Sequence, residues 1–249
     1  MNPSNGRHFV VEPRFCGPPR SGNGGYVAGR VAAFVNRLAS DAAVEVTLRS
    51  PPPLGVRLDV SDSADELQVH NGEILVAQAQ SSVLTARVPS SVPFEDAVEA
   101  AERYAGRRSH PFPTCFVCGL DRARGDGLRL QAGSVGVARV AAAWQPHESL
   151  AACAAPHDVI PEEFVWAALD CPGGWAAGFE GRPMVLGRMT ARVLSTPQVN
   201  RRCVVVGQVR DIEGRKAFTA SALYDDTGEL FAHAEATWLT IDPATVRPH

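Results

Sequence analysis

Residues 184–241 read MVLGRMTARVLSTPQVNRRCVVVGQVRDIEGRKAFTASALYDDTGELFAHAEATWLTI, and their pattern indicates the fold class of this chain. Alternating or β-branched runs occupy 184–194, 203–210, 216–225 and 230–241. The last three runs are separated by DIEG at 211–214 and DDTG at 225–228, which are typical of hairpin turns that end in glycine. The pattern predicts an antiparallel meander of four strands.

A helix is expected directly before this meander, at 161–171 (PEEFVWAALDC). Pro161 suits a first helical position, and Glu162 and Glu163 complement the positive end of the helix dipole. The run Pro172-Gly173-Gly174 then ends or kinks the helix. Further upstream, 127–131 and 135–145 predict a hairpin that turns through Ala132-Gly133-Ser134.

The first half of the chain shows a similar order of elements. A short strand at 8–15 is followed by a glycine-rich loop at 21–25 and by a helix from about 25 to 39. That helix has Arg30 and Arg37 opposite an apolar stripe at helical spacing, formed by Val27, Val31, Phe34, Val35 and Leu38. Strands follow at 43–49, 56–60, 66–70 and 73–80, the last two joined by Asn71-Gly72, a pair typical of type I′ turns.

The chain thus repeats one plan, in which a strand and a helix precede four antiparallel strands. A helix that covers one face of a curled antiparallel sheet is an α+β arrangement. Residues 93–106 predict a connecting helix between the two copies. We therefore expect an N-terminal domain at 1–106, which includes the connecting helix, and a C-terminal domain at 107–249.

Three stretches of sequence resemble the hotdog superfamily. Residues 161–177 (PEEFVWAALDCPGGWAA) and the strands after them are similar to the second half of many hotdog thioesterases. Residues 115–130 (CFVCGLDRARGDGLRL) resemble a lead-in of bacterial thioesterase-like hotdog proteins, and 21–29 (SGNGGYVAG) resembles the glycine-rich entry into the central helix, often His-Gly-Gly. The resemblance implies two tandem hotdog domains, each a long central helix wrapped by a curled antiparallel β-sheet.

Two hotdogs in one chain resemble the fused thioesterase II type, whose halves pair as a pseudo-dimer with the site at their interface. The resemblance implies an enzyme that hydrolyses acyl-CoA or related acyl thioesters, with an acyl-CoA-type small molecule as its partner. Two alternatives stay open: a hotdog protein that binds acyl or aryl thioesters with little or no turnover, and an enoyl-CoA hydratase or dehydratase. Further association into homo-oligomers is common in this family.

Composition limits the partners and the compartment. The formal net charge of -3 and the pI near 6.2 give no basic bias, so neither nucleic acid nor an anionic membrane is expected as a partner. No apolar run approaches the ~18 residues that span a bilayer, and the N-terminus lacks the apolar segment of a secretory signal. We expect a cytoplasmic protein with reduced cysteines. Lys216 is the only lysine among many arginines, which is typical of a high-GC bacterial genome.

Thioester hydrolysis requires donors for the developing oxyanion and a carboxylate that activates water or attacks directly. The helix that starts at Gly24-Gly25 offers such donors, because N–H groups point outward at a helix N-terminus and glycine permits close approach. Alternatively, Gly22, Gly24 and Gly25 serve only a tight turn. Asn23 stands where the related motif often has histidine, and it either orients the thioester or a water molecule, or caps the helix.

Asp170 is the candidate acid. In the hotdog pattern, Pro161 takes the histidine position and Asp170 follows nine residues later, at the position of the acid. The matching residue counted from Asn23 is Ala32, so the first half would supply amides and the second half the acid. An acid in an apolar segment is costly unless it is paired, so the alternative is an Asp170 paired with arginine or capping the turn before Pro172.

Thr190 is the second catalytic candidate. The thioesterase II type adds a threonine and a glutamine on its second sheet to the aspartate of the helix. Thr190 falls on a suitable predicted strand, but Glu235 stands near the position of the glutamine. The alternative is that both are ordinary polar residues of strands.

The pair Cys115-x-x-Cys118 raises the question of zinc, with Cys153 and His157 as the remaining ligands. These two lie in an Ala/Pro-rich loop, and the chain has no second Cys-x-x-Cys, so structural packing is the expected role. A redox pair is disfavoured because no thioredoxin-like βαβ pattern surrounds it. Neither a metal nor a cofactor is expected, since the glycine-rich loop fails the dinucleotide fingerprint and no Walker loop or nucleophile elbow is present.

Overall fold

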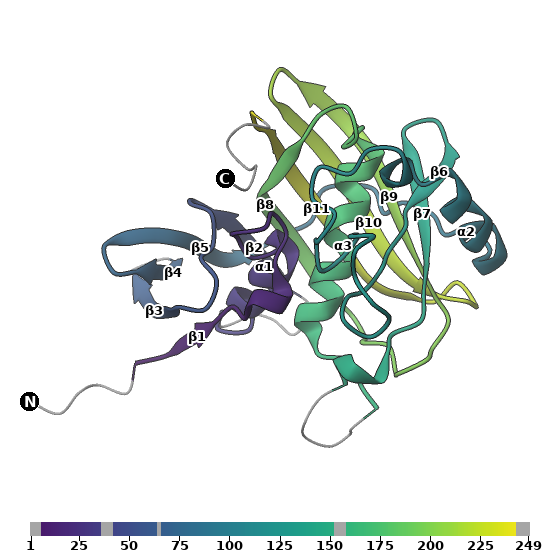
Figure 1. The fold of residues 1–249 in the computed structure, drawn as a ribbon. Coiled ribbons are helices and arrows are strands. Elements are labelled where there is room, and N and C mark those ends of the chain that lie inside the picture. Colours follow the sequence, from purple (N-terminus) through teal and green to yellow (C-terminus); the bar gives the residue numbers. More distant parts are fainter. Residues whose placement is uncertain (1–5, 36–41, 64–65, 152–157, 243–249) are drawn as a thin grey trace, which may run out of the picture.

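The computed structural model describes residues 6–35, 42–63, 66–151 and 158–242, and within them eleven strands form one antiparallel sheet. Helices α1 (Gly24–Ala32) and α3 (Glu162–Ala176) lie against this sheet and pack on one another (Figure 1). Helix α2 (Phe94–Ala100) packs against the sheet at Ala141, Val204 and Val206. The strands are β1 (His8–Val10), β2 (Ala43–Leu48), β3 (Arg57–Ser63), β4 (Glu66–Asn71), β5 (Ile74–Ser82), β6 (Gly133–Gly136), β7 (Arg139–Trp144), β8 (Met184–Val193), β9 (Cys203–Glu213), β10 (Lys216–Asp225) and β11 (Leu230–Thr240).

The order of the strands is nearly symmetric about the centre of the sheet. It runs β1-β3-β4-β5-β2-β8-β11-β10-β9-β7-β6, and β2 pairs with β8 through the register Val44↔Ala191 to Thr47↔Arg188. Outward from this pair, β5 corresponds to β11, β4 to β10, β3 to β9 and β1 to β7, while β6 has no counterpart among the described strands. Each half of the chain therefore contributes one contiguous half of the sheet and one helix that packs on the other.

The hydrophobic core lies between the helices and the sheet. Trp166 and Leu169 of α3 are buried, as are the inward-facing Val46, Met189 and Leu223 of the strands. The cluster of buried apolar side chains is continuous across the two halves, because α1 packs directly on α3. In the part of the chain that the structure describes, no helix is long and apolar enough to cross a membrane.

The predicted four-stranded meander is correct for three of its strands. Strands β9, β10 and β11 are joined by tight turns, in which Gly214 has φ 54° and Gly228 has φ 91°. The prediction is wrong for β8, which pairs with β11 and β2 rather than with β9. The connection at 194–202 contains no tight hairpin turn, so long-range pairing sets the neighbours of β8.

The predicted hairpin of 127–131 with 135–145 is also wrong. The observed hairpin joins β6 to β7 and turns at 137–138, where Ala138 has φ 51°. Residues 127–131 run instead along the turn that contains the two cysteines: Leu128 N–H donates to the Phe116 carbonyl and Leu130 N–H to the Val117 carbonyl, both at 2.8 Å. Between them, Arg129 has φ 55°, which is incompatible with a continuous strand.

Helix α3 is longer than predicted, because it continues through Pro172 to Ala176. Glu162 and Glu163 do occupy its first turn, whereas Pro161 immediately precedes the helix. Past Pro172 the helix lies directly on the sheet, since a Cβ on Gly207 of β9 would be 2.3 Å from the Pro172 carbonyl oxygen. We attribute the survival of the helix beyond Pro172 to this close packing, which outweighs the intrinsic helix-breaking tendency of proline.

The first helix and the first strand of the chain are shorter than predicted. Helix α1 ends at Ala32 and a turn occupies 33–35, while Arg37 and Leu38 lie outside the described residues. The predicted strand at 8–15 is reduced to β1, followed by a 3₁₀ turn at Pro13–Phe15. The β4–β5 hairpin turns at 72–73, and only Gly72 of these has positive φ (59°), so the type I′ prediction is wrong. The connecting segment forms α2 and two 3₁₀ turns, Ala101–Arg103 and Ala105–Arg107.

Candidate active site

A cavity of about 440 Å³ opens beside the first turn of α1 and is lined by both halves of the chain. Its polar side chains include Asn23, from the loop before α1, and Asp170, from the middle of α3. Arg20 and Arg49 also line the cavity and are exposed to solvent. Most of the wall is apolar, and its larger side chains are Leu48, Pro52, Phe112, Phe179, Met184, Leu186, Trp238 and Ile241.

The carboxylate of Asp170 is bound by the N-terminus of α1. Its Oδ2 accepts hydrogen bonds from Asn23 Nδ2 at 2.9 Å and from the Gly25 backbone N–H at 3.0 Å. Its Oδ1 is buried and has no hydrogen-bond partner among the described residues. Asp170 is 2% exposed, and within the described part of the chain no arginine pairs with it, so the alternative of an arginine ion pair is not observed.

Two glycines of α1 allow this contact between the helices. A Cβ on Gly25 would be 2.5 Å from Asp170 Cβ and 2.7 Å from the Trp166 carbonyl oxygen. A Cβ on Gly29, one turn later on the same face, would be 2.6 Å from Glu163 Cα. Because neither position has room for a side chain, α1 approaches α3 backbone to backbone and brings its first turn to Asp170.

Burial raises the pKa of Asp170 to about 7, and it is opposed by the hydrogen bonds from Gly25 and Asn23. The nearby Cys115 sulfur adds a smaller upward effect on this pKa. A carboxyl group with such a pKa exchanges its proton near neutral pH, as a general base requires. Asp170 lines the cavity, and Oδ1 is the carboxylate oxygen that has no partner among the described residues.

Asn23 caps the helix, as one of the two alternatives from the sequence has it, and it also binds Asp170, which neither alternative included. Its Oδ1 caps α1 by accepting a hydrogen bond from Tyr26 N–H at 2.9 Å, while its Nδ2 holds Asp170. This single side chain fixes the start of one helix and an acid on the other. Because the cap binds the oxygen of the side-chain amide, the NH₂ end of that amide points toward the acid.

The two predicted oxyanion amides lie in different positions. The Gly25 N–H is directed at Asp170 rather than at the cavity, because this glycine faces α3, so its predicted oxyanion role does not match the geometry. Gly24 lines the cavity and packs against Leu186, and its N–H makes no hydrogen bond with a described residue. An unpaired N–H at a helix N-terminus is suited to bind a developing negative charge.

The structure does not bring Thr190 to this cavity. It lies on β8 between Glu235 of β11 and Glu45 of β2, and Glu235 forms an ion pair with Arg210 at 2.8 Å. The register of β8 shifts at Gly187: Leu186 pairs with Trp238, and Arg188 pairs with the adjacent Thr237. This bulge inverts the alternation of side chains, so Thr190 faces away from the helices.

Three thiols lie next to Asp170. The sulfur atoms of Cys115, Cys118 and Cys171 are all within 4.8 Å of one another and are buried. Asn23 Nδ2 is 3.9 Å from the sulfur atoms of both Cys115 and Cys171. The other two residues that the sequence offered for zinc, Cys153 and His157, lie outside the described residues.

Sequence reasoning overlooked several residues of the site. Cys171 was not grouped with Cys115 and Cys118, although it directly follows Asp170. The spacing of Gly25 and Gly29 predicts a helix face without side chains, but it does not predict which helix packs on that face. The apolar wall of the cavity could not be predicted from the sequence, because its side chains come from segments that are distant along the chain.

No protein-family model matches the chain, and no curated protein sequence matches it significantly. Solved structures do match, over nearly the whole chain. A TesB protein from Mycobacterium avium subspecies paratuberculosis has a TM-score of 0.60 at 12% identity and covers 94% of this chain and 92% of that chain. The acyl-CoA thioesterase II TesB2 from Mycobacterium marinum has a TM-score of 0.59 at 10% identity, covering 98% and 96%.

A protein with a hotdog fold from Alicyclobacillus acidocaldarius has a TM-score of 0.61 at 13% identity and covers 95% of this chain and 93% of that chain. At these identities the likeness concerns the fold. The α+β arrangement of a large antiparallel sheet with few helices agrees with it. The chain therefore shares the hotdog fold of these structures.

Proposed function

We propose that this protein hydrolyses acyl-CoA or related acyl thioesters at the junction of two tandem hotdog domains, 1–106 and 107–249. The near-symmetric order of the strands supports this division, with α1 and α3 as the central helices. One observation carries the functional proposal: Asp170, an acid on one helix, lies at the N-terminus of the other helix and in the wall of an apolar cavity.

In the proposed reaction, Asp170 is a general base. Its Oδ1 takes a proton from water, and the water oxygen attacks the thioester carbonyl carbon. The Gly24 N–H binds the oxyanion that forms. Collapse of the tetrahedral intermediate breaks the C–S bond, and the thiolate leaves. Asn23 positions Asp170 throughout.

The cavity fits an acyl group with a phosphorylated carrier. Its wall is mostly apolar, so an acyl chain can be buried there. Arg20 and Arg49 line the same cavity and are exposed to solvent, where they can pair with the phosphates of coenzyme A. The cytoplasmic location, the bacterial origin and the homo-oligomeric association stay predictions.

A second candidate is an acyl-thioester-binding protein without efficient turnover. The position of Thr190 favours it, because the second polar group of the thioesterase II type is missing from the cavity. A hydratase is less consistent with the site, since no histidine of the described chain lines the cavity.

A panel of acyl-CoAs, followed by the release of free thiol, tests the proposal. We expect hydrolysis by the wild type and a loss of about a hundredfold or more in kcat for Asp170→Asn. Thr190→Val is the control, and it should retain activity because its side chain faces away from the cavity. Tight binding without thiol release would support the binding protein instead. Hydration of an enoyl-CoA would contradict both.

A further inference from the structure

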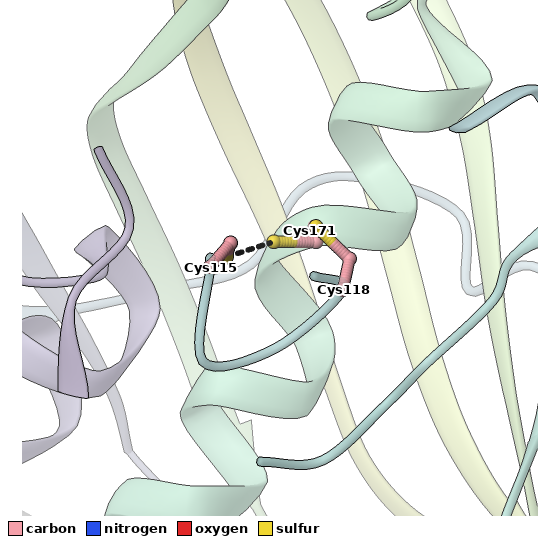
Figure 2. A group of neighbouring side chains, drawn as sticks. All are labelled: Cys115, Cys118 and Cys171. Carbon is pink, nitrogen blue, oxygen red and sulfur yellow. Dashed lines mark hydrogen bonds between the residues drawn. The ribbon is translucent and has the colours of Figure 1, made fainter. Parts of the chain in front are cut away.

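The buried thiols of Cys115, Cys118 and Cys171 form a cluster that the proposed hydrolysis does not use. Cys115 and Cys118 lie on the turn that leads into the second half of the chain, and Cys171 lies on α3. Figure 2 shows the three side chains converging on one another from the turn and the helix. The Cys115 and Cys171 sulfur atoms are 3.8 Å apart, and all three sulfur atoms lie within 4.8 Å of one another.

This spacing matches the geometry of thiolates around a tetrahedral metal ion. With Zn–S bonds of about 2.3 Å, neighbouring sulfur atoms at tetrahedral angles are separated by about 3.8 Å. The observed distance between Cys115 and Cys171 has this value. A disulfide would require a separation of about 2.05 Å.

The turn around the first two cysteines has a tightly folded backbone. The Gly119 N–H donates to the Cys115 carbonyl at 2.9 Å. A Cβ on Gly119 would be 2.4 Å from the Pro113 carbonyl oxygen and 2.5 Å from that of Cys115, so the tight turn requires glycine there. This turn holds the thiols of Cys115 and Cys118 close to each other and to that of Cys171.

We propose that Cys115, Cys118 and Cys171 bind one zinc ion, or a similar thiophilic divalent cation, and so fasten the turn at 112–119 to helix α3. Three soft sulfur ligands in a buried setting select zinc over calcium or magnesium. This set contains Cys171, which the sequence did not assign to a metal, and it requires neither Cys153 nor His157. The inference replaces the expectation that no metal is bound, and it does not depend on the proposed hydrolysis.

Zinc takes four ligands, and the described residues supply three of them. Cys171 lines the cavity, so the fourth position can be filled from that side by a water molecule or another small ligand. The ion would also hold the segment of α3 that carries Asp170. Its main role is therefore to fix the position of the acid beside α1.

The experiment measures metal binding by the full-length protein, purified under reducing conditions, by elemental analysis and by Co(II) titration after chelator treatment. We expect one equivalent of zinc per chain, and with Co(II) a thiolate-to-metal charge-transfer band with intense tetrahedral d–d bands. Cys115→Ser, Cys118→Ser and Cys171→Ser should each weaken these signals. Cys203→Ser is the matched control, since Cys203 is equally buried but lies at the start of β9.

Several results would overturn the proposal. The first is a wild-type protein that contains no zinc and shows no cobalt–thiolate bands. The second is a set of cobalt bands that Cys171→Ser leaves unchanged. A disulfide between two of these cysteines in freshly purified, metal-free protein would also overturn it. Circular dichroism identifies variants that fail to fold. If they do fail, the Co(II) titration of the wild type still shows whether the protein binds metal through thiolates.

Discussion

The Asp170 carboxylate lies 2.9 Å from the Asn23 side-chain amide, although the two residues come from opposite halves of the chain. Asn23 caps α1, and Asp170 lies in the middle of α3, so this hydrogen bond couples the start of one helix to the other. The acid is thereby buried in a cavity wall at the junction, with one oxygen bound and the other without a partner in the described part of the chain. The predictions below follow from this relationship.

The first prediction concerns the pH dependence of activity. A general base must be deprotonated, and burial raises the pKa of Asp170 to about 7. The value of kcat/KM for acyl-CoA hydrolysis should therefore rise with pH and reach half its maximum near that pKa. Steady-state rates in a series of buffers provide the measurement. A rate that is already constant from about pH 5 upward would contradict a base with a raised pKa, because an aspartate with an ordinary pKa is ionised there.

The second prediction concerns stability. Because the folded pKa of Asp170 is raised, the folded state retains the proton more tightly, and stability falls as pH rises from the unfolded pKa to about 7. Asp170→Asn removes this ionisation, and its amide oxygen can accept the same two hydrogen bonds. Above neutral pH the variant should be more stable than the wild type, by up to about 4 kcal/mol.

Urea denaturation at about pH 5 and at about pH 8 measures this difference. The advantage of Asp170→Asn should grow between the two conditions. An equal effect at both pH values would mean that the carboxyl group does not change its ionisation in this range.

The third prediction separates the two functions of Asn23. Asn23→Ala removes the helix cap, at a cost of about 1 kcal/mol, and the donor that favours ionised Asp170. Asn23→Ser keeps a capping oxygen but removes the amide donor. Both variants should shift the pH–rate profile to higher pH, and only Asn23→Ala should lose the stability of the cap. Thermal unfolding and kcat/KM profiles together distinguish these effects, and an unshifted profile in both variants would rule out the positioning role.

The fourth prediction tests the contact between the helices. Gly25→Ala places a Cβ 2.5 Å from Asp170 Cβ and 2.7 Å from the Trp166 carbonyl oxygen, so α1 must move away from α3. We expect a loss of about 1–3 kcal/mol in the free energy of unfolding, together with a loss of activity. Gly181→Ala is the control, because a Cβ there meets nothing within 4 Å. Equal stability of the two variants would show that α1 and α3 are packed less closely than the structure indicates.

Local chemistry in the sequence was sufficient to predict the hairpins of β9, β10 and β11 and the start of α3. Turn residues and periodicity act over a few residues, so they can be interpreted without knowing the rest of the molecule. The resemblance to hotdog proteins supplied the expectation that the two halves meet at one site.

Long-range packing determined the rest. The neighbours of β8 depend on strands distant in sequence, and the bulge at Gly187 turned Thr190 away from the cavity, because a shift of one residue moves a side chain to the opposite face of a sheet. Likewise, Gly25 faces Asp170 and Cys171 joins Cys115 and Cys118 only once α3 is packed against α1 and the turn. Sequence periodicity specifies the apolar face of an element, whereas the identity of its partner depends on the assembled core.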